Sequence, residues 1–217
     1  METFSFFLAS TPLLIHMLLV SAIRLSGRYY VTTRGREIIS LAFAVSGMIA
    51  IGPVELFFPM AAAAVFGPLV WAVLVLFYSL CTALLVLGAK PRLVVYGGEP
   101  RDLLEPLLMA ARSVDSDATA VESQLQIFLP QHGVHLKVSG QRSSDYSNVV
   151  AFEDNLSIEF WSVLRAALRE QLRGRVVSRR RGVLLGLATI IFAGFLIFQI
   201  FQSGDQLTDG IQDWIWR

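Results

Sequence analysis

The run FGPLVWAVLVLFYSLCTALLVLGA, at residues 66–89, contains no Asp, Glu, Lys, Arg or His. It is longer than the ~20 residues that an α-helix, which rises about 1.5 Å per residue, needs to cross a hydrocarbon core ~30 Å thick. A helix of this length in a soluble protein would need a polar face, and this run has none. The run therefore predicts a membrane-spanning helix.

Three further apolar runs of comparable length lie at residues 4–23, 38–58 and 183–201. Only two ionisable residues occur within them, His16 in the first and Glu55 near the end of the second. The composition agrees, because charged residues make up 16% of the 217 residues, against about 25% in a typical soluble domain. We expect a membrane α-helical bundle of four transmembrane helices.

The arginine and lysine residues predict how this bundle is oriented. They are frequent between the first and second runs and between the third and fourth, but they are absent between the second and third. Cytoplasmic loops carry an excess of these basic residues. We therefore expect both termini outside the cell membrane and residues 24–37 and 90–182 in the cytoplasm.

An alternative is that Val20-Ser21-Ala22 marks a cleavage site and the first run is a signal peptide. However, the segment before this run contains Glu2 and no basic residue. Cleavage would also export the basic loop at residues 24–37. We favour an uncleaved first helix.

Residues 90–176 predict a small cytoplasmic α+β domain, inserted between the third and fourth helices. Short apolar segments and helical spacing give the order strand, helix, strand, strand, strand, helix, which suits a sheet covered by helices. We expect residues 113–119 to form a loop and the last helix to run on into the fourth span. The strands are expected at residues 93–96, 124–129, 135–138 and 148–152, and the helices from Pro100 (with Pro106 as a possible break) and from Asn155 or Ser157.

These boundaries divide the chain into four parts. Residues 1–89 are expected to form the three-helix transmembrane region, and residues 90–176 the cytoplasmic domain. Residues 177–203 comprise a basic juxtamembrane segment and the fourth transmembrane helix. Residues 204–217 form an outer tail, whose apolar and acidic faces at helical spacing are typical of a short helix on the membrane surface.

Glu55 and His16 are the candidate polar residues within the membrane. An ionisable side chain in a span is costly and normally faces a partner or water. Glu55 lies only about 5 Å from the outer boundary by rise per residue, so an interfacial position in water is the simpler interpretation. His16 lies deeper, and we expect a neutral imidazole bonded to a neighbouring helix. Because of this difference in depth, a direct proton relay between the two residues is not expected.

A cluster of arginines precedes the fourth span. Such residues interact favourably with anionic lipid headgroups at the cytoplasmic surface, and they also fix the orientation of the helix. The orienting role alone suffices to explain them. The candidate headgroup contacts are Arg173, Arg175, Arg179, Arg180 and Arg181.

The sequence shows no motif of catalysis. Gly97-Gly98 lies where a phosphate could be bound at a helix N-terminus, but the full phosphate-binding patterns are absent and Glu99 follows at once, so we interpret it as a tight turn. His132 and His135 have a spacing that would point two strand side chains to opposite faces, which argues against a shared metal ion. We therefore expect no catalytic residue, no metal site and no cofactor.

Four segments in order, GPVELFFP, FGPLVW, FYSL and KPRLVVY, resemble a group of uncharacterised bacterial membrane proteins of planctomycete type. The resemblance covers mainly the second and third spans and the entry into the domain. It implies a bacterial inner (cytoplasmic) membrane and carries over no site residues.

Taken together, these features favour a membrane-anchored interaction or regulatory module whose cytoplasmic domain binds a partner. The expected partners are the lipid bilayer and a protein or a second copy of the chain, not nucleic acid. The alternative is a component of a transporter or channel that uses Glu55 and His16. A water-accessible cavity that reaches Glu55 would favour this alternative.

Overall fold

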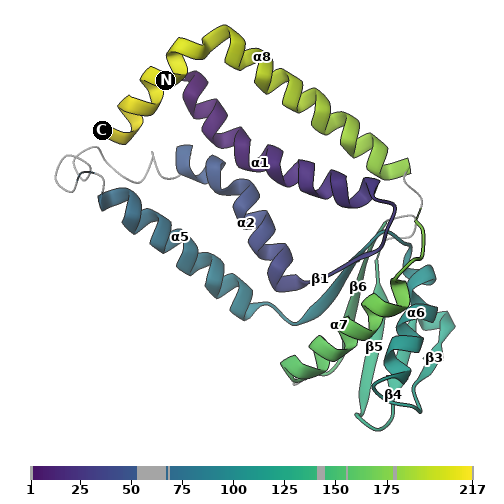
Figure 1. Ribbon diagram of the computed structural model, residues 1–217. Coiled ribbons are helices and arrows are strands. Elements are labelled where there is room, and N and C mark those ends of the chain that lie inside the picture. The colour runs from purple at the N-terminus through teal and green to yellow at the C-terminus, as the bar shows by residue number, and fades with distance from the viewer. Residues whose placement is uncertain are drawn as a thin grey trace. The chain divides into compact units, whose positions relative to one another are not determined.

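The computed structural model of the chain describes residues 2–52, 67, 69–140, 145–154, 156–177 and 180–216. Within these ranges three helical segments are long and apolar enough to span a membrane, namely Ser5–Leu25, Leu69–Gly88 and Gly182–Gln202. They belong to helices α1 (Glu2–Leu25), α5 (Leu69–Gly88) and α8 (Arg180–Trp216) (Figure 1). Three helices of the described part of the chain therefore have the length and composition to cross a membrane.

The second expected span corresponds to helix α2, which covers Arg34–Ile51. The end of that expected span, from residue 53 onward, lies outside the described residues, and so does Glu55. The described part of α2 is not one of the three segments with the length and hydropathy of a span.

Contacts divide the chain into two compact units. The helical unit consists of Met1–Ser21, Ile38–Gly88 and Leu184–Arg217, and the sheet unit of Ala22–Glu37 and Ala89–Val183. The sheet unit therefore contains the first connecting loop as well as the long segment between α5 and α8.

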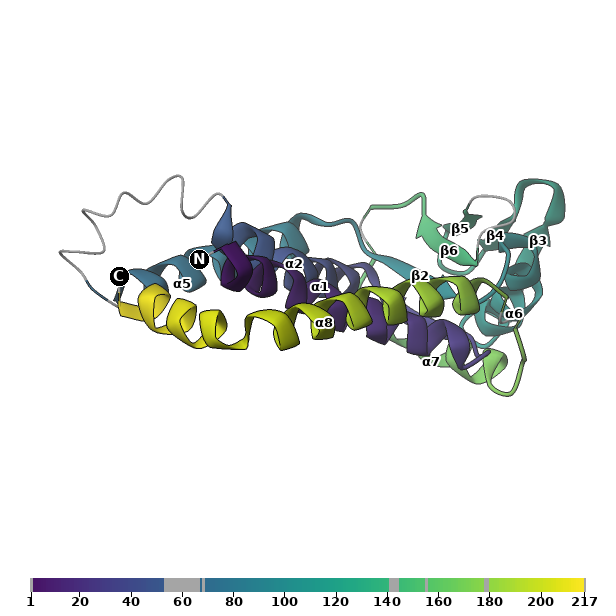
Figure 2. The same cartoon turned by 90° about the horizontal axis from the view of Figure 1, so that it is seen from above.

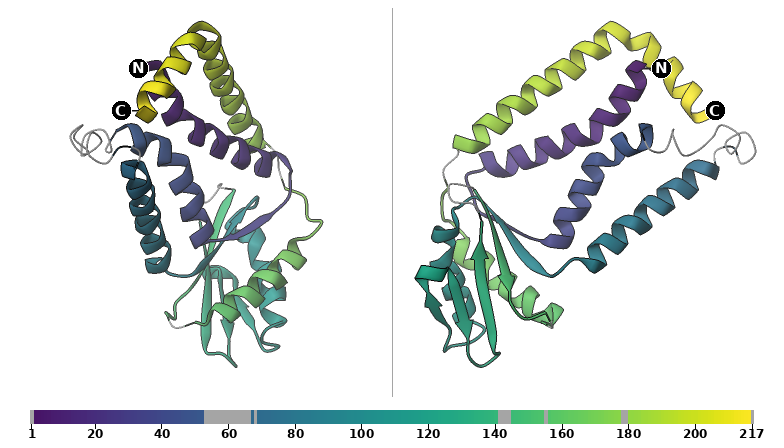
Figure 3. Two further views of the ribbon diagram at one scale, coloured as in Figure 1. Left: turned by 60° about the vertical axis from the view of Figure 1, so that its left-hand side comes forward. Right: turned by 180° about the vertical axis from the view of Figure 1, so that it is seen from behind.

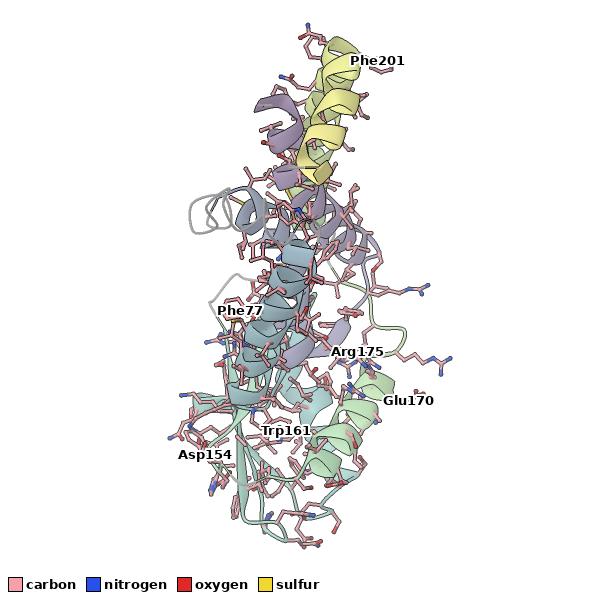
Figure 4. All side chains as sticks on the ribbon, turned by 90° about the vertical axis from the view of Figure 1, so that its left-hand side faces the viewer. Phe77, Asp154, Trp161, Glu170, Arg175 and Phe201 are labelled. Atoms are coloured by element: carbon pink, nitrogen blue, oxygen red, sulfur yellow. The ribbon has the colours of Figure 1, made fainter. Side chains whose placement is uncertain are left out.

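Polar contacts link the apolar helices of the helical unit. Ser21 Oγ lies 3.0 Å from Thr189 Oγ1, and the Tyr78 hydroxyl donates to the carbonyl oxygen of Ala42 at 2.6 Å. Large apolar side chains point away from the helices, and among them Phe77 and Phe201 are 64% and 85% exposed (Figure 4). Such exposure is expected of helices that have lipid as their solvent.

The sheet unit is built on six antiparallel strands in the order β1-β2-β6-β5-β4-β3. Helices α6 (Pro100–Arg112) and α7 (Ile158–Leu172) pack on one face of this sheet (Figure 3). The strands are β1 (Tyr30–Thr33), β2 (Arg92–Tyr96), β3 (Thr119–Val121), β4 (Gln126–Leu129), β5 (Val134–Ser139) and β6 (Tyr146–Ala151), with a 3-10 turn at Glu122–Gln124.

The core of this unit lies between the sheet and the two helices. Alternate residues of the strands, such as Leu93, Leu136 and Val149, point into it, because successive side chains of a strand face opposite sides. Leu107 of α6 and Leu164 of α7 meet them and are fully buried. Each such leucine contributes about 1.5–3 kcal/mol relative to an exposed position.

Strands β1 and β2 form a hairpin that helices α2 and α5 interrupt. Tyr30 pairs with Tyr96 and Thr33 pairs with Leu93, so the end of β1 lies beside the start of β2. All of α2 and α5 lies in the chain between these two strands. The expectation of a simple loop at residues 24–37 was therefore wrong. A four-residue edge strand with one buried apolar residue, Val31, carries almost no periodic signal.

Several other elements differ from expectation. Helix α7 ends at Leu172 and does not continue into α8, because Gly174 adopts a φ of +81° that turns the chain. A loop was expected at residues 113–119, but its last residue, Thr119, begins the short edge strand β3 at residues 119–121. Helix α6 runs through Pro106 without a break. Of the two candidate caps of α7, Ser157 accepts the bond from the Phe160 amide at 3.1 Å, whereas Asn155 lies outside the described residues.

Candidate functional site

A groove of about 800 Å³ lies on the sheet unit, between α6 and the edge of the sheet at β3. Helix α6 and β3 lie side by side at one end of this unit (Figure 2). Apolar side chains form the floor: Leu104 and Leu108 from α6, Ala120 from β3 and Leu125 from the following turn. Leu104 and Leu108 are four residues apart, so they lie on the same face of the helix.

The rim of the groove is acidic. Glu99, Glu105 and Glu122 line it and are exposed, whereas Arg101 is the one basic residue among its described lining residues. Three carboxylates against one guanidinium give the groove a negative potential, which attracts cationic partners. An apolar floor with a charged rim is the usual composition of a binding site for an amphipathic peptide.

The backbone beside the groove is held in a constrained conformation. Leu125 has a φ of +52°, in the left-handed region that residues other than glycine rarely adopt. Its carbonyl oxygen accepts a hydrogen bond from the Val138 amide at 2.8 Å, which ties the turn to β5. Strained backbone positions persist where surrounding contacts enforce them, and they gather at binding sites.

The structure places the two intramembrane candidates differently. His16 Nδ1 lies 2.9 Å from Ser40 Oγ of α2, within the helical unit. An imidazole bonded to a neighbouring helix is the interpretation that the sequence favoured. Glu55 lies outside the described residues. No observation within the described residues therefore favours a transport pathway.

The candidate lipid contacts also have different outcomes. Arg173 and Arg175 line a second cavity of about 630 Å³ on the sheet unit, together with Arg28 and Arg169. Arg28 and Arg169 were not predicted as headgroup contacts. Arg28 lies in a remote part of the sequence that only the fold brings near, and Arg169 lies on α7, one helical turn before Arg173. Arg179 lies outside the described residues, and only the helical backbone of Arg180 and Arg181 is described.

Gly97-Gly98 forms a turn, with Gly97 at a φ of +122°. A side chain at Gly98 would collide with the ring of Tyr29, which lies within 2.6 Å of where its Cβ would be. The two glycines thus leave room for the segment before β1. Burial and the nearby Asp102 carboxylate raise the pKa of Tyr29, although Arg175 opposes this, so the phenol is neutral.

The two histidines have separate partners. His135 Nδ1 lies 3.0 Å from a Glu153 carboxylate oxygen, and its ring stacks on Phe128 at a centroid distance of 4.4 Å. His132 lies beside Asp115 instead, at 3.8 Å. Among the described residues no group of three or more His, Cys, Asp or Glu side chains is arranged to hold a metal ion.

A half-buried polar cluster centres on Glu37, at the start of α2, and was not predicted. The carboxylate accepts hydrogen bonds from the hydroxyls of Tyr146 at 2.9 Å and Tyr96 at 3.2 Å, and from Arg34 at 2.7 Å. Burial raises the pKa of Tyr96, and the Glu37 charge raises it further, so its hydroxyl remains a donor. The cluster ties Arg34 and Glu37 to strands β2 and β6 of the same unit, and these contacts occupy its polar groups.

The groove is therefore the surface whose shape and charge are least explained by the fold itself. Its residues offer an apolar floor and exposed carboxylates, which suit the binding of a cationic, amphipathic partner. No protein-family model, no curated protein and no solved structure matches this chain.

Proposed function

We propose that this chain is a membrane-anchored interaction module. Four transmembrane helices anchor it in a bacterial inner membrane with both termini outside, and its sheet unit lies in the cytoplasm and binds a protein partner. The groove between α6 and β3 supports this proposal, because it combines an apolar floor with an acidic rim. Its occupant is a basic amphipathic segment of a partner protein, since its charges complement such a segment.

Labelling with a membrane-impermeant thiol reagent tests the orientation. Cys81, the single cysteine of the chain, is first replaced by serine. A cysteine introduced at Ala63 is expected to react in intact cells. A cysteine at Ser123, which is exposed on the sheet unit, is expected to react only after the membrane is opened. The reverse pattern would place the sheet unit outside and overturn the proposal.

Photo-cross-linking in cells tests the groove. A photoreactive amino acid at Ser123, on the groove, is expected to capture a partner, whereas one at Val163, which is 51% exposed on α7, is expected to capture none. Replacing both Glu105 and Glu122 by lysine should reduce the Ser123 adduct roughly tenfold or more, because like charges now face a basic segment.

The matched control replaces Asp154 and Glu159 by lysine, which changes the charge equally at exposed positions away from the groove. This control should leave the adduct unchanged. Equal loss in the two variants would mean that net charge, and not the groove, governs binding.

A further inference from the structure

A second cavity of the sheet unit has a lining that the proposed partner site does not explain. It lies between the edge strand β1, the end of α7 and the segment after α7. Four arginines line it, Arg28, Arg169, Arg173 and Arg175, and its described lining residues include no aspartate or glutamate. Four like charges around one cavity repel one another, and an anion bound among them would relieve this repulsion.

The backbone fixes the position of these arginines. The φ of +81° at Gly174 reverses the chain, and residues 176–177 then return along the sheet edge. The Val177 amide donates to the carbonyl oxygen of Gly27 at 2.9 Å, and Val176 forms a β-bridge with Arg28. Arginines from two segments that are about 140 residues apart along the chain are thereby held around one cavity.

One of the arginines has a structural role. Arg169 donates through Nη2 and Nε to the carbonyl oxygen of Val31, at 2.8 and 3.3 Å. This contact satisfies a backbone acceptor on the open edge of β1, which would otherwise be free to pair with another strand. It also holds the guanidinium in a fixed orientation at the cavity.

The other arginines are available to a ligand. Arg173 lies 3.6 Å from Glu170, and both side chains are more than 70% exposed. Arg175 lies 3.3 Å from Glu105, which is 66% exposed (Arg175 and Glu170 are labelled in Figure 4). Exposed ion pairs of this kind contribute little, because water competes for both partners. A doubly charged anion can therefore replace these carboxylates.

We propose that this cavity binds a phosphate group. Guanidinium groups bind phosphate through paired, charge-assisted hydrogen bonds. A phosphate dianion carries two negative charges where a carboxylate carries one, so it suits a site lined by several guanidinium groups. Such a phosphate can belong to a lipid headgroup or to a soluble molecule. The chain enters α8 a few residues beyond Arg175, and α1 ends shortly before Arg28, so the site lies next to two apolar helices along the sequence.

Binding by the full chain, purified in a neutral detergent, tests the site. Two probes are titrated separately: inorganic phosphate, and short-chain phosphatidic acid in mixed micelles, with phosphatidylcholine as the zwitterionic reference. Replacing both Arg173 and Arg175 by glutamine should weaken binding of the effective probe about tenfold or more, since two charge-assisted hydrogen bonds are lost. Arg173 is exposed, Arg175 is partly exposed, and neither belongs to the core of the sheet unit, so the variant should elute from a sizing column like the wild type.

The control replaces Lys90 and Lys137 by glutamine, which removes the same charge from exposed positions of the sheet unit outside both the cavity and the groove. It should bind within about twofold of the wild type. Binding of inorganic phosphate indicates a soluble ligand, and binding of phosphatidic acid alone indicates a headgroup. Failure of both probes to bind, or equal loss in the control, would overturn the proposal. None of these outcomes depends on a protein partner in the groove.

Discussion

A soluble fragment that joins residues 26–34 to residues 90–177 through a short glycine-serine turn is expected to fold as a monomer, whereas residues 90–177 alone are expected to aggregate. The reason is the interrupted hairpin. Thr33 and Leu93 are paired, so a turn of a few residues can replace the helices that separate them. Without β1, strand β2 exposes a row of unpaired backbone groups, which is a template for association with other chains. The core also loses Val31, which is 2% exposed.

Sizing chromatography and circular dichroism of the two fragments provide the measurement. The matched control keeps the joined length but replaces Val31 and Thr32 by proline, which cannot donate the ladder hydrogen bonds of β1. This variant should behave like the fragment without β1. A monomeric fragment of residues 90–177 that unfolds as cooperatively as the joined one would show that β1 contributes nothing to the sheet.

The long helices and the central strands could be predicted because their signals are local. The lack of charged residues at 66–89 is enough to predict a spanning helix, and a helix covers Leu69–Gly88. Strands β2, β5 and β6 lie within a residue or two of the expected segments. Strands β2 and β5 each carry three buried apolar residues, and β6 carries a run of apolar residues at Val149–Ala151.

The edge strands could not be predicted for the opposite reason. Strand β1 has Val31 as its inward apolar residue, and β3 has Ala120. Their assignment depends on partners, and the partner of β1 begins at Arg92, beyond two helices. A period of two cannot be recognised in a strand of three or four residues. Whether such a short segment pairs as a strand depends on the partner strand that the fold places beside it.

The candidate sites show the same division. Arg173 and Arg175 could be singled out because they stand in a basic cluster of the sequence. Arg28 could not be joined to them, since the β-bridge that places it depends on the turn at Gly174. The acidic rim of the groove likewise combines Glu105 of α6 with Glu122 beyond β3, and neither residue is unusual in its local sequence.

The two proposed sites share one ion pair. Arg175 lines the basic cavity and Glu105 lines the groove, and their charged atoms lie 3.3 Å apart. A phosphate that takes up Arg175 would leave Glu105 without its counter-ion and make the groove more acidic. A basic segment in the groove would in turn release Arg175. By linkage each ligand would then strengthen the binding of the other to the same extent.

The Trp161→Ala substitution is expected to destabilise the sheet unit by about 3–5 kcal/mol, because it opens a large cavity in the core. Trp161 is 7% exposed on α7, and its ring packs edge-on against Phe160 at a centroid distance of 5.8 Å. On the same helix, Val163 is 51% exposed. Val163→Ala should therefore change stability by less than about 0.5 kcal/mol. Pulse proteolysis of the full chain across a urea series measures both variants.

Trp161→Phe separates packing from hydrogen bonding. The indole Nε1 is buried and has no hydrogen-bond partner among the described residues. A buried donor without a partner costs about 1–3 kcal/mol, so its removal offsets part of the volume that phenylalanine fails to fill. We therefore expect Trp161→Phe to lie much closer to the wild type than Trp161→Ala. If the alanine variant were as stable as the wild type, Trp161 could not be part of the core, and the face of α7 that carries it would have to be a surface for a partner.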